Sequence, residues 1–362
     1  MKKITNIDKL MNLNVHGTQP KWKIGTAWYK ADDFNHEGLA ETIVSDMLQK
    51  SNVRRYAVYE PELIQYNGKV VTGCKSEHFL KPEEKLIEAT TLFDLYGKGD
   101  VIKDDTESIK DPEQSIKEFL STIKDITGLT EFDWYLTMMF ELDKIILNPD
   151  RHFGNITVIK TDKGFDYAPF FDQGRAFALC DDLWDRKKSV DEIIASVDSR
   201  PFSGIFSRQT DILESITKKD ILEINYSLTD LKHTLDKCAD TYPDEILNRA
   251  EAVFRIQLEK NLRYFIGEEM DTRLNTIMSS IDKKFHHPCQ CEKRHKDILI
   301  IPDDKNGIHF CISVDKDIQV LKDGIILADE DLILNYNDSL QIYKDLYHAM
   351  EDEALIDMEI NR

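Results

Sequence analysis

Short apolar runs separated by turn residues fill residues 22–74 of the chain. A helical pattern interrupts them at residues 38–49, where Leu39, Ile43 and Met47 recur every four positions and mark one buried face. The strand patterns on either side form two hairpins, residues 23–30 about a turn at Gly25-Thr26 and residues 58–65 and 70–74 about a turn at Asn67-Gly68. The pattern therefore predicts a small β-rich region around one helix.

Helical periods dominate after residue 79. The strongest covers residues 131–147, whose apolar positions are three or four apart, and Pro149 should end it by forcing Asn148 out of the α region. A hairpin is expected at residues 156–168, and helical patterns resume from residue 190 to residue 268.

The pattern changes again near residue 296, to strands at residues 298–301, 309–314 and 319–321 and a last helix near residues 339–350. A chain of 362 residues and 42.1 kDa is longer than one hydrophobic core usually holds. We therefore expect an α+β chain in three parts, which are a small β-rich lobe at residues 1–80, a helical lobe at 81–283 and an α/β appendage at 284–362.

Composition narrows the class of partner. Apolar residues make up 41% of the chain and charged residues 31%, as in soluble enzymes. Lys and Arg number 47 against 67 Asp and Glu, so the net charge of −20 repels phosphate backbones and anionic membranes. Neither a signal peptide nor a run long enough to span a membrane is apparent. We expect a cytoplasmic protein that binds neither nucleic acid nor membrane directly.

The six cysteines are scattered and do not form a disulfide framework. Cys289 and Cys291, with His295 and Cys311 beyond them, could assemble a zinc site, but their spacing is shorter than the usual two to four residues. An exposed loop of ordinary residues is the favoured interpretation.

The strongest chemical signal lies on either side of the hairpin at residues 156–168. Asp150 and Asn155 have the separation of the catalytic Asp and the metal-binding Asn of protein kinases. Asp172 follows the hairpin, comes after an apolar residue and precedes a glycine closely, as a second metal ligand would. Oxygen side chains of this kind suit Mg²⁺. Each residue alone is compatible with a turn, but together they predict a Mg–ATP site.

The β-rich lobe offers a phosphate-binding lysine. Lys30 ends an apolar strand segment and could point inward, with Glu41 of the next helix as its partner and Glu37 as the competing choice. Upstream, the backbone N–H groups of a turn at residues 16–21 could cover the phosphates, although a single glycine there is a weak signal on its own.

These features resemble, in chain order, the motifs of HipA-like serine/threonine kinases, above all their shorter CtkA-type bacterial members. The matching stretches are Gly17-Thr18-Gln19-Pro20-Lys21, the strand ending at Lys30, Ala40-Glu41, Asp150-Arg151-His152 with Asn155, and Ala168-Pro169-Phe170-Phe171-Asp172. The resemblance covers about residues 17–270 and implies a bilobal protein-kinase-like fold.

The resemblance also implies roles. Asp150 would be the catalytic base, and Asn155 and Asp172 would hold Mg²⁺. Lys30 would bind the phosphates with Glu41 as its partner. His152 would orient the catalytic loop, unless it is a buried structural histidine. The remaining ATP-binding residues would be Gly17, Thr18, Gln19 and Lys21 of the phosphate loop and Glu77 and Phe79 of the adenine-binding hinge.

One departure from the kinase pattern is Gln173-Gly174, which follows Asp172 where many kinases have Phe-Gly. We expect a kinase that uses ATP and Mg²⁺ to phosphorylate Ser or Thr hydroxyls of a protein, either itself or a cellular target, with a possible partner protein at the appendage. The alternatives are a lipid or small-molecule kinase, a nucleotide-binding scaffold with little catalysis, and a metal hydrolase using Asp150, His152 and Asp172.

Overall fold

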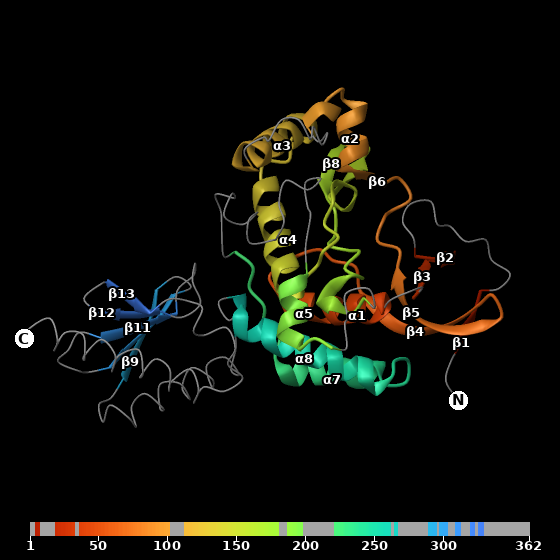
Figure 1. Cartoon of the computed structure of the whole chain (residues 1–362). Coiled ribbons are helices and arrows are strands. Elements are labelled where there is room, and N and C mark those ends of the chain that lie inside the picture. Colours follow the sequence, from red (N-terminus) through yellow and green to blue (C-terminus); the bar gives the residue numbers. More distant parts are fainter. Residues whose placement is uncertain are drawn as a thin grey trace, which may run out of the picture. The chain divides into compact units, whose positions relative to one another are not determined.

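The computed structural model describes residues 4–7, 19–32, 36–101, 112–180, 187–197, 221–261 and 264–266 and five strands nearer the carboxyl end (Figure 1). The chain groups into two compact units, Met1–Arg255 and Ile256–Arg362. The boundaries expected at residues 80 and 283 stay a prediction.

The first unit begins with a five-stranded sheet in the order β1-β4-β5-β3-β2. Its strands are β1 (Ile4–Asn6), β2 (Lys21–Ile24), β3 (Ala27–Ala31), β4 (Tyr59–Tyr66) and β5 (Lys69–Glu77). Both predicted hairpins are confirmed as the antiparallel pairs β2–β3 and β4–β5. β1 was not predicted; it adds to β4 in parallel.

Helix α1 (Glu37–Leu48) is the predicted helix and packs on β4 and β5. Leu39, Ile43 and Met47 are buried as expected, but almost all the remaining residues of α1 are buried as well. The opposite side of α1 meets helix α7 (Leu228–Cys238), where Asp46 accepts hydrogen bonds from Thr234 and Lys237 at 2.8 Å each. The helix is therefore held between a sheet and a second helix.

The other described helices begin in this unit. They are α2 (Ala89–Leu95), α3 (Pro112–Thr127), α4 (Phe132–Ile146), α5 (Val190–Ser196) and α8 (Asp244–Lys260), the last of which continues past the unit's end at Arg255, with 3-10 turns η1 (Gly99–Val101), η2 (Phe153–Asn155) and η3 (Ala176–Ala178). α4 ends where predicted, and the last residue before the loop, Leu147, takes a left-handed conformation with φ 55°. No helix among the residues described is long and apolar enough to cross a membrane.

The third predicted hairpin, at residues 156–168, is confirmed as β7 (Thr157–Thr161) and β8 (Gly164–Tyr167). A third strand that the sequence pattern missed, β6 (Lys85–Glu88), pairs with β7. Beyond β8 the chain returns to the first sheet region, because Phe170 accepts a hydrogen bond from Ala57 at 2.8 Å and donates one to Arg55 at 2.9 Å. This attachment fixes the segment that carries Asp172.

The second unit contains an antiparallel sheet in the order β13-β12-β11-β10-β9. Its strands are β9 (Cys289–Arg294), β10 (Asp297–Pro302), β11 (Ile308–Ile312), β12 (Gln319–Lys322) and β13 (Ile325–Ala328). Three of them match predicted strands, and β9 and β13 do not. The loop expected around Cys289 and Cys291 is wrong, because both cysteines belong to β9 and pair with β10. The helix expected near residues 339–350 lies outside the described residues.

Candidate active site

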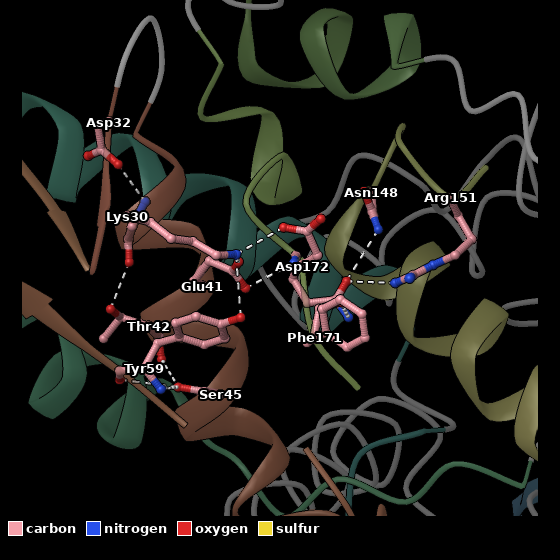
Figure 2. A network of polar contacts seen from close by, with 12 residues as sticks. Lys30, Asp32, Glu41, Thr42, Ser45, Tyr59, Asn148, Arg151, Phe171 and Asp172 are labelled. Carbon is pink, nitrogen blue, oxygen red and sulfur yellow. Dashed lines mark hydrogen bonds and ion pairs between the residues drawn. The ribbon is translucent and has the colours of Figure 1, made fainter. Parts of the chain in front are cut away.

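Three charged side chains from distant parts of the chain meet at one point (Figure 2). The Lys30 ammonium of β3 lies 2.7 Å from Glu41 Oε1 of α1 and 2.9 Å from Asp172 Oδ1 beyond β8. The Tyr59 ring of β4 lies beneath the ammonium, 5.1 Å from it. Lys30 and Glu41 are 14% and 1% exposed, whereas the Asp172 side chain remains 45% exposed. One oxygen of the group therefore faces solvent while the lysine is enclosed.

The competition between Glu41 and Glu37 has a steric answer. Lys30 pairs with Glu41, and Glu37, one turn earlier on α1, packs against Gly174. A Cβ atom on Gly174 would lie 2.9 Å from Cβ of Glu37. The glycine after Gln173 thus lets the start of α1 approach the segment that carries Asp172.

The charges in this group support one another. Burial alone would lower the pKa of Lys30, but Asp172 and Glu41 together raise it well above its ordinary value. Lys30 in turn lowers the pKa of Asp172 against the opposing effect of burial. Burial raises the pKa of Glu41, and Lys30 offsets part of that rise. Lys30 is therefore a permanent cation at neutral pH, with Asp172 ionised beside it.

Gln173 connects this group to the loop after α4. Its backbone N–H donates to Glu41 Oε2 at 2.9 Å, and its buried side-chain oxygen accepts from Arg151 at 2.8 Å and from Asn148 at 3.2 Å. Asp172 just before it has a left-handed φ of 64°, which turns the chain so that the two side chains face different partners. Gln173 thus has a structural role at the position where many kinases have a phenylalanine.

A buried ion pair holds the loop against α4. Arg151 forms two hydrogen bonds with Asp143, at 2.7 and 3.0 Å, and both side chains are at most 1% exposed. Arg151 also donates to the carbonyl of Asn155 at 2.9 Å, and Asn148 accepts from the backbone of Asp150 at 3.1 Å. The loop of residues 148–155 therefore has a defined conformation.

Sequence reasoning missed Arg151, Asp143, Asn148 and Gln173 as supports of the site. An arginine beside the candidate base was one available signal. An acidic residue in the last turn of an apolar helix was another, since buried charges are paired.

Asp150 and Asn155 lie on this loop as the spacing predicted. The Asn155 amide nitrogen donates to the carbonyl of Asp150 at 2.7 Å. Within the described part of the chain, Asn155 Oδ1 and Asp172 Oδ2 accept no hydrogen bond. These two oxygens are the type of ligand that Mg²⁺ takes. The chemistry of these oxygens is compatible with such an ion, and Mg²⁺ binding by Asn155 and Asp172 stays a prediction.

The Asp150 carboxylate is 49% exposed. Partial burial raises its pKa, and the nearby His152 and Arg175 offset part of that rise. His152 is 56% exposed, so the alternative of a buried structural histidine is wrong. Its Nδ1 accepts from the backbone N–H of Gly154 at 3.0 Å and so caps the turn η2.

The predicted phosphate loop is described in part. Gly17 and Thr18 lie outside the described residues, whereas Gln19 and Lys21 are inside them. Lys21 of β2 stands opposite Lys30 of β3 in the sheet register. Burial and the neighbouring charge of Lys30 lower the pKa of Lys21. Lys21 thus lies beside the phosphate-binding candidate, and its role stays a prediction.

The predicted hinge, residues 74–79, covers the last part of β5, which ends at exposed Glu77. The next residue, His78, donates its backbone N–H to Thr26 at 2.7 Å. The Phe79 ring lies 5.5 Å from the ring of Phe171, which immediately precedes Asp172. Phe79 therefore belongs to the surroundings of the charged group, and adenine binding by Glu77 and Phe79 remains a prediction.

The two metal-based alternatives have no further support. No group of three or more His, Cys, Asp or Glu side chains able to hold a metal ion occurs among the residues that were described, and a hydrolase centre at Asp150, His152 and Asp172 stays an untested alternative. His295 and the side chains of Cys289, Cys291 and Cys311 lie outside that description, so the zinc site stays a prediction.

Comparison with known proteins gives distant likenesses only. No family model matches the chain, and no curated protein matches it in sequence. Among solved structures, the chain is similar to the Helicobacter pylori proinflammatory kinase CtkA, with a TM-score of 0.46 and 14% identity over 71% of this chain and 95% of that one. It is also similar to a chain of the HipA–HipB toxin–antitoxin complex with operator DNA from Shewanella oneidensis MR-1, with a TM-score of 0.35 and 14% identity over 70% of this chain and 58% of that one. Likenesses at this level assign neither a family nor an activity.

Proposed function

We propose that this protein is a kinase that uses ATP and Mg²⁺ to phosphorylate Ser or Thr hydroxyls of a protein. One observation carries the proposal. Lys30 is held between Glu41 and Asp172, and Gln173 links that group to the loop that bears Asp150 and Asn155. Phosphoryl transfer by protein kinases requires two features to be in place. One is an ion pair between a strand lysine and a helix glutamate, and the other is a metal-binding aspartate.

Lys30 suits the binding of phosphate oxygens. Its charge persists at neutral pH because two carboxylates stabilise it, and its enclosure limits competition from water. Glu41 accepts from Lys30 with one oxygen and from the Gln173 backbone with the other, which orients the ammonium toward Asp172. A Mg²⁺ ion held by Asn155 and Asp172 would neutralise charge that develops on the transferred phosphoryl group.

Asp150 suits the role of base. A hydroxyl that attacks a phosphoryl group must lose its proton, and a carboxylate within hydrogen-bond reach can accept it. The backbone of Asp150 is fixed from two sides, by Asn148 and by Asn155, while its side chain stays accessible. A scaffold that only binds nucleotide has no use for such a positioned carboxylate.

The choice of acceptor follows from the sequence motifs and the net charge. The motifs that resemble HipA-like kinases favour a Ser or Thr hydroxyl of a protein over a lipid or small-molecule acceptor. The net charge of −20 also disfavours docking on anionic membrane.

The test is incubation of the purified protein with γ-labelled ATP and Mg²⁺, followed by intact mass measurement and peptide mapping. We expect label on Ser or Thr peptides in the wild type and in Asp162→Ala, which removes an exposed carboxylate from the β7–β8 turn, and none in Asp150→Ala. Label on a small molecule or lipid, with no labelled peptide, would overturn the protein-kinase assignment. A complete lack of ATP binding would overturn the kinase assignment altogether.

A further inference from the structure

A second polar cluster lies two residues beyond Lys30 on the same stretch of chain. Asp32 Oδ1 accepts from the backbone N–H of Gly38, in the first turn of α1, at 2.7 Å. Its Oδ2 accepts from Thr72 of β5 at 2.8 Å and lies 3.0 Å from the hydroxyl of Tyr242 in the α7–α8 turn. One carboxylate therefore joins β3, β5, α1 and the helical region, close to the Lys30–Glu41 pair (Figure 2).

The backbones at this cluster are in direct contact. A Cβ atom on Gly38 would lie 2.5 Å from the Gly73 carbonyl carbon and 2.5 Å from the Tyr242 hydroxyl. A Cβ atom on Gly73 would overlap the carbonyl oxygen of Lys30. No side chain separates α1 from β5 here, so these contacts set the height of the first turn of α1 above the sheet. Glu41 follows Gly38 by three residues and so lies on the same face of the helix.

The hydrogen bonds of Tyr242 cannot all form at once if Asp32 is ionised. The hydroxyl is placed to donate to Asp32 at 3.0 Å and to the Gly73 carbonyl at 3.1 Å, but it has one proton. If Asp32 carries a proton, it donates to Tyr242, and Tyr242 donates to Gly73. Burial and then the charge of Glu37 raise the pKa of Asp32 to about 7, so both forms occur near neutral pH.

We propose that Asp32, Gly38, Gly73 and Tyr242 form a positioning cluster that holds α1 so that Glu41 meets Lys30. We propose further that all contacts of this cluster form together only when Asp32 carries a proton. The consequence for turnover rests on the proposed kinase function. The effect on the position of α1 does not.

Loss of that proton works against this arrangement in two ways. Ionised Asp32 accepts the hydrogen bond of the Tyr242 hydroxyl, which leaves the Gly73 carbonyl without its donor, and it repels Glu37 at the start of α1. Among the described residues, the other ionisable groups that face Asp32 or Tyr242 are His36 before α1, Cys74 of β5 and Cys238 of α7. Burial raises the pKa of the Cys74 and Cys238 thiols, so both stay neutral where Asp32 titrates. The first turn of α1, and Glu41 with it, should therefore move away from Lys30 as the pH rises through the pKa of Asp32.

The activity test is the pH profile of KM for ATP and of kcat in the wild type and in Asp32→Asn, which imitates the neutral carboxyl. In the wild type we expect KM for ATP to rise about fivefold between pH 6.5 and 8.5, the factor that one net hydrogen bond corresponds to. In Asp32→Asn the low-pH value should persist at pH 8.5. Titration of ATP itself is common to both proteins. Equal KM profiles in the two proteins would overturn the proposal.

Tyr242→Phe provides the second arm. It should raise KM for ATP at every pH and remove most of the pH dependence. The matched control is Tyr167→Phe, which also deletes a hydroxyl bonded to main chain, here the N–H of Glu131 at 3.0 Å, but does so away from α1. Equal effects of the two variants on KM would show that Tyr242 has only a general structural role and would contradict the proposal.

A third readout separates this proposal from the kinase assignment. Hydrogen exchange of the α1 amides, corrected for intrinsic rates, should speed up between pH 6.5 and 8.5 in the wild type and not in Asp32→Asn. If the wild type transfers no phosphate, the kinase assignment fails, but the exchange difference would still support the proposed positioning cluster. If the exchange rates show no such difference, the cluster proposal is refuted whether or not the protein is a kinase.

Discussion

At the scale of single residues, the geometry of the site depends on how its buried charged side chains are paired. Lys30 faces two carboxylates, and this excess of negative charge leaves room for a further cation at the exposed side of Asp172. Arg151 and Asp143, in contrast, satisfy each other in the interior. The first arrangement suits a ligand with both phosphates and a metal ion, and the second holds the loop that carries Asp150.

Replacement of Lys30 with methionine should abolish most of the activity. The methionine side chain would keep the apolar stem but lose the charge that stabilises the phosphates, so we expect kcat/KM for ATP to fall by at least about 100-fold. The pKa of Asp172 should rise, because Lys30 is the main cause of its depression. Lys163→Met, at the exposed turn between β7 and β8, is the control for loss of one positive charge. Steady-state kinetics with wild-type rates in Lys30→Met would contradict the role of Lys30.

Replacement of Arg151 tests the buried ion pair. Arg151→Met should lower the free energy of unfolding by about 3–5 kcal/mol, because Asp143 would be left charged in the interior. Lys117→Met removes an exposed helix cation paired with Glu113 and should cost no more than about 0.5 kcal/mol. Urea unfolding followed by circular dichroism measures both. Similar small losses in the two variants would mean that Arg151 does not hold the loop.

At the scale of elements, the sequence predicted what local periodicity determines and missed what distant contacts determine. Both hairpins of the first sheet, α1, α4 and the β7–β8 hairpin follow from apolar spacing and turn residues. β1 and β6 are three and four residues long and exist because a neighbouring strand pairs with them. Sequence reasoning found the site residues whose spacing along the chain matches a kinase motif. It missed Arg151, Asp143 and Gln173, because the partners of these side chains are known only from the folded structure.

The first turn of α1 offers a test at this scale. Alanine is a better helix former than glycine by about 1 kcal/mol, so Gly38→Ala would stabilise a free helix. In the protein its Cβ atom would overlap the Gly73 carbonyl carbon and the Tyr242 hydroxyl, and we expect a loss of about 1–3 kcal/mol together with reduced turnover. Thermal unfolding and kinetics measure the two effects. A stabilised variant with full activity would show that the contact is not tight.

At the scale of the whole molecule, the first unit brings residues from both ends of a long stretch of sequence to one point. Lys30 and Asp172 are separated by 142 positions, and the Phe170–Ala57 backbone hydrogen bond explains how the later segment returns to the sheet. The net charge of −20 makes the local cation at Lys30 the more necessary for any anionic ligand. The second unit forms a sheet of its own, for which a partner protein remains a prediction.

The pH dependence of turnover tests the whole arrangement. Only ionised Asp150 can accept a proton, and its pKa lies above the ordinary aspartate value. The value of kcat should therefore reach a plateau above that pKa and fall tenfold per unit as the pH drops below it. Measurement of kcat against pH at saturating ATP, with the fold monitored by circular dichroism at each pH, locates this limb. A limb at or below the pKa of a free aspartate would contradict Asp150 as the base.

The most direct measurement is single-turnover phosphoryl transfer from γ-labelled ATP in the wild type, Asp150→Ala and Asp172→Ala, with ATP binding measured in parallel. We expect the wild type to transfer phosphate, Asp150→Ala to bind ATP in the presence of Mg²⁺ without transfer, and Asp172→Ala to lose transfer together with the effect of Mg²⁺ on binding. Wild-type transfer rates in both variants would show that the Lys30–Glu41–Asp172 group and the loop at Asp150 are not a phosphoryl-transfer site.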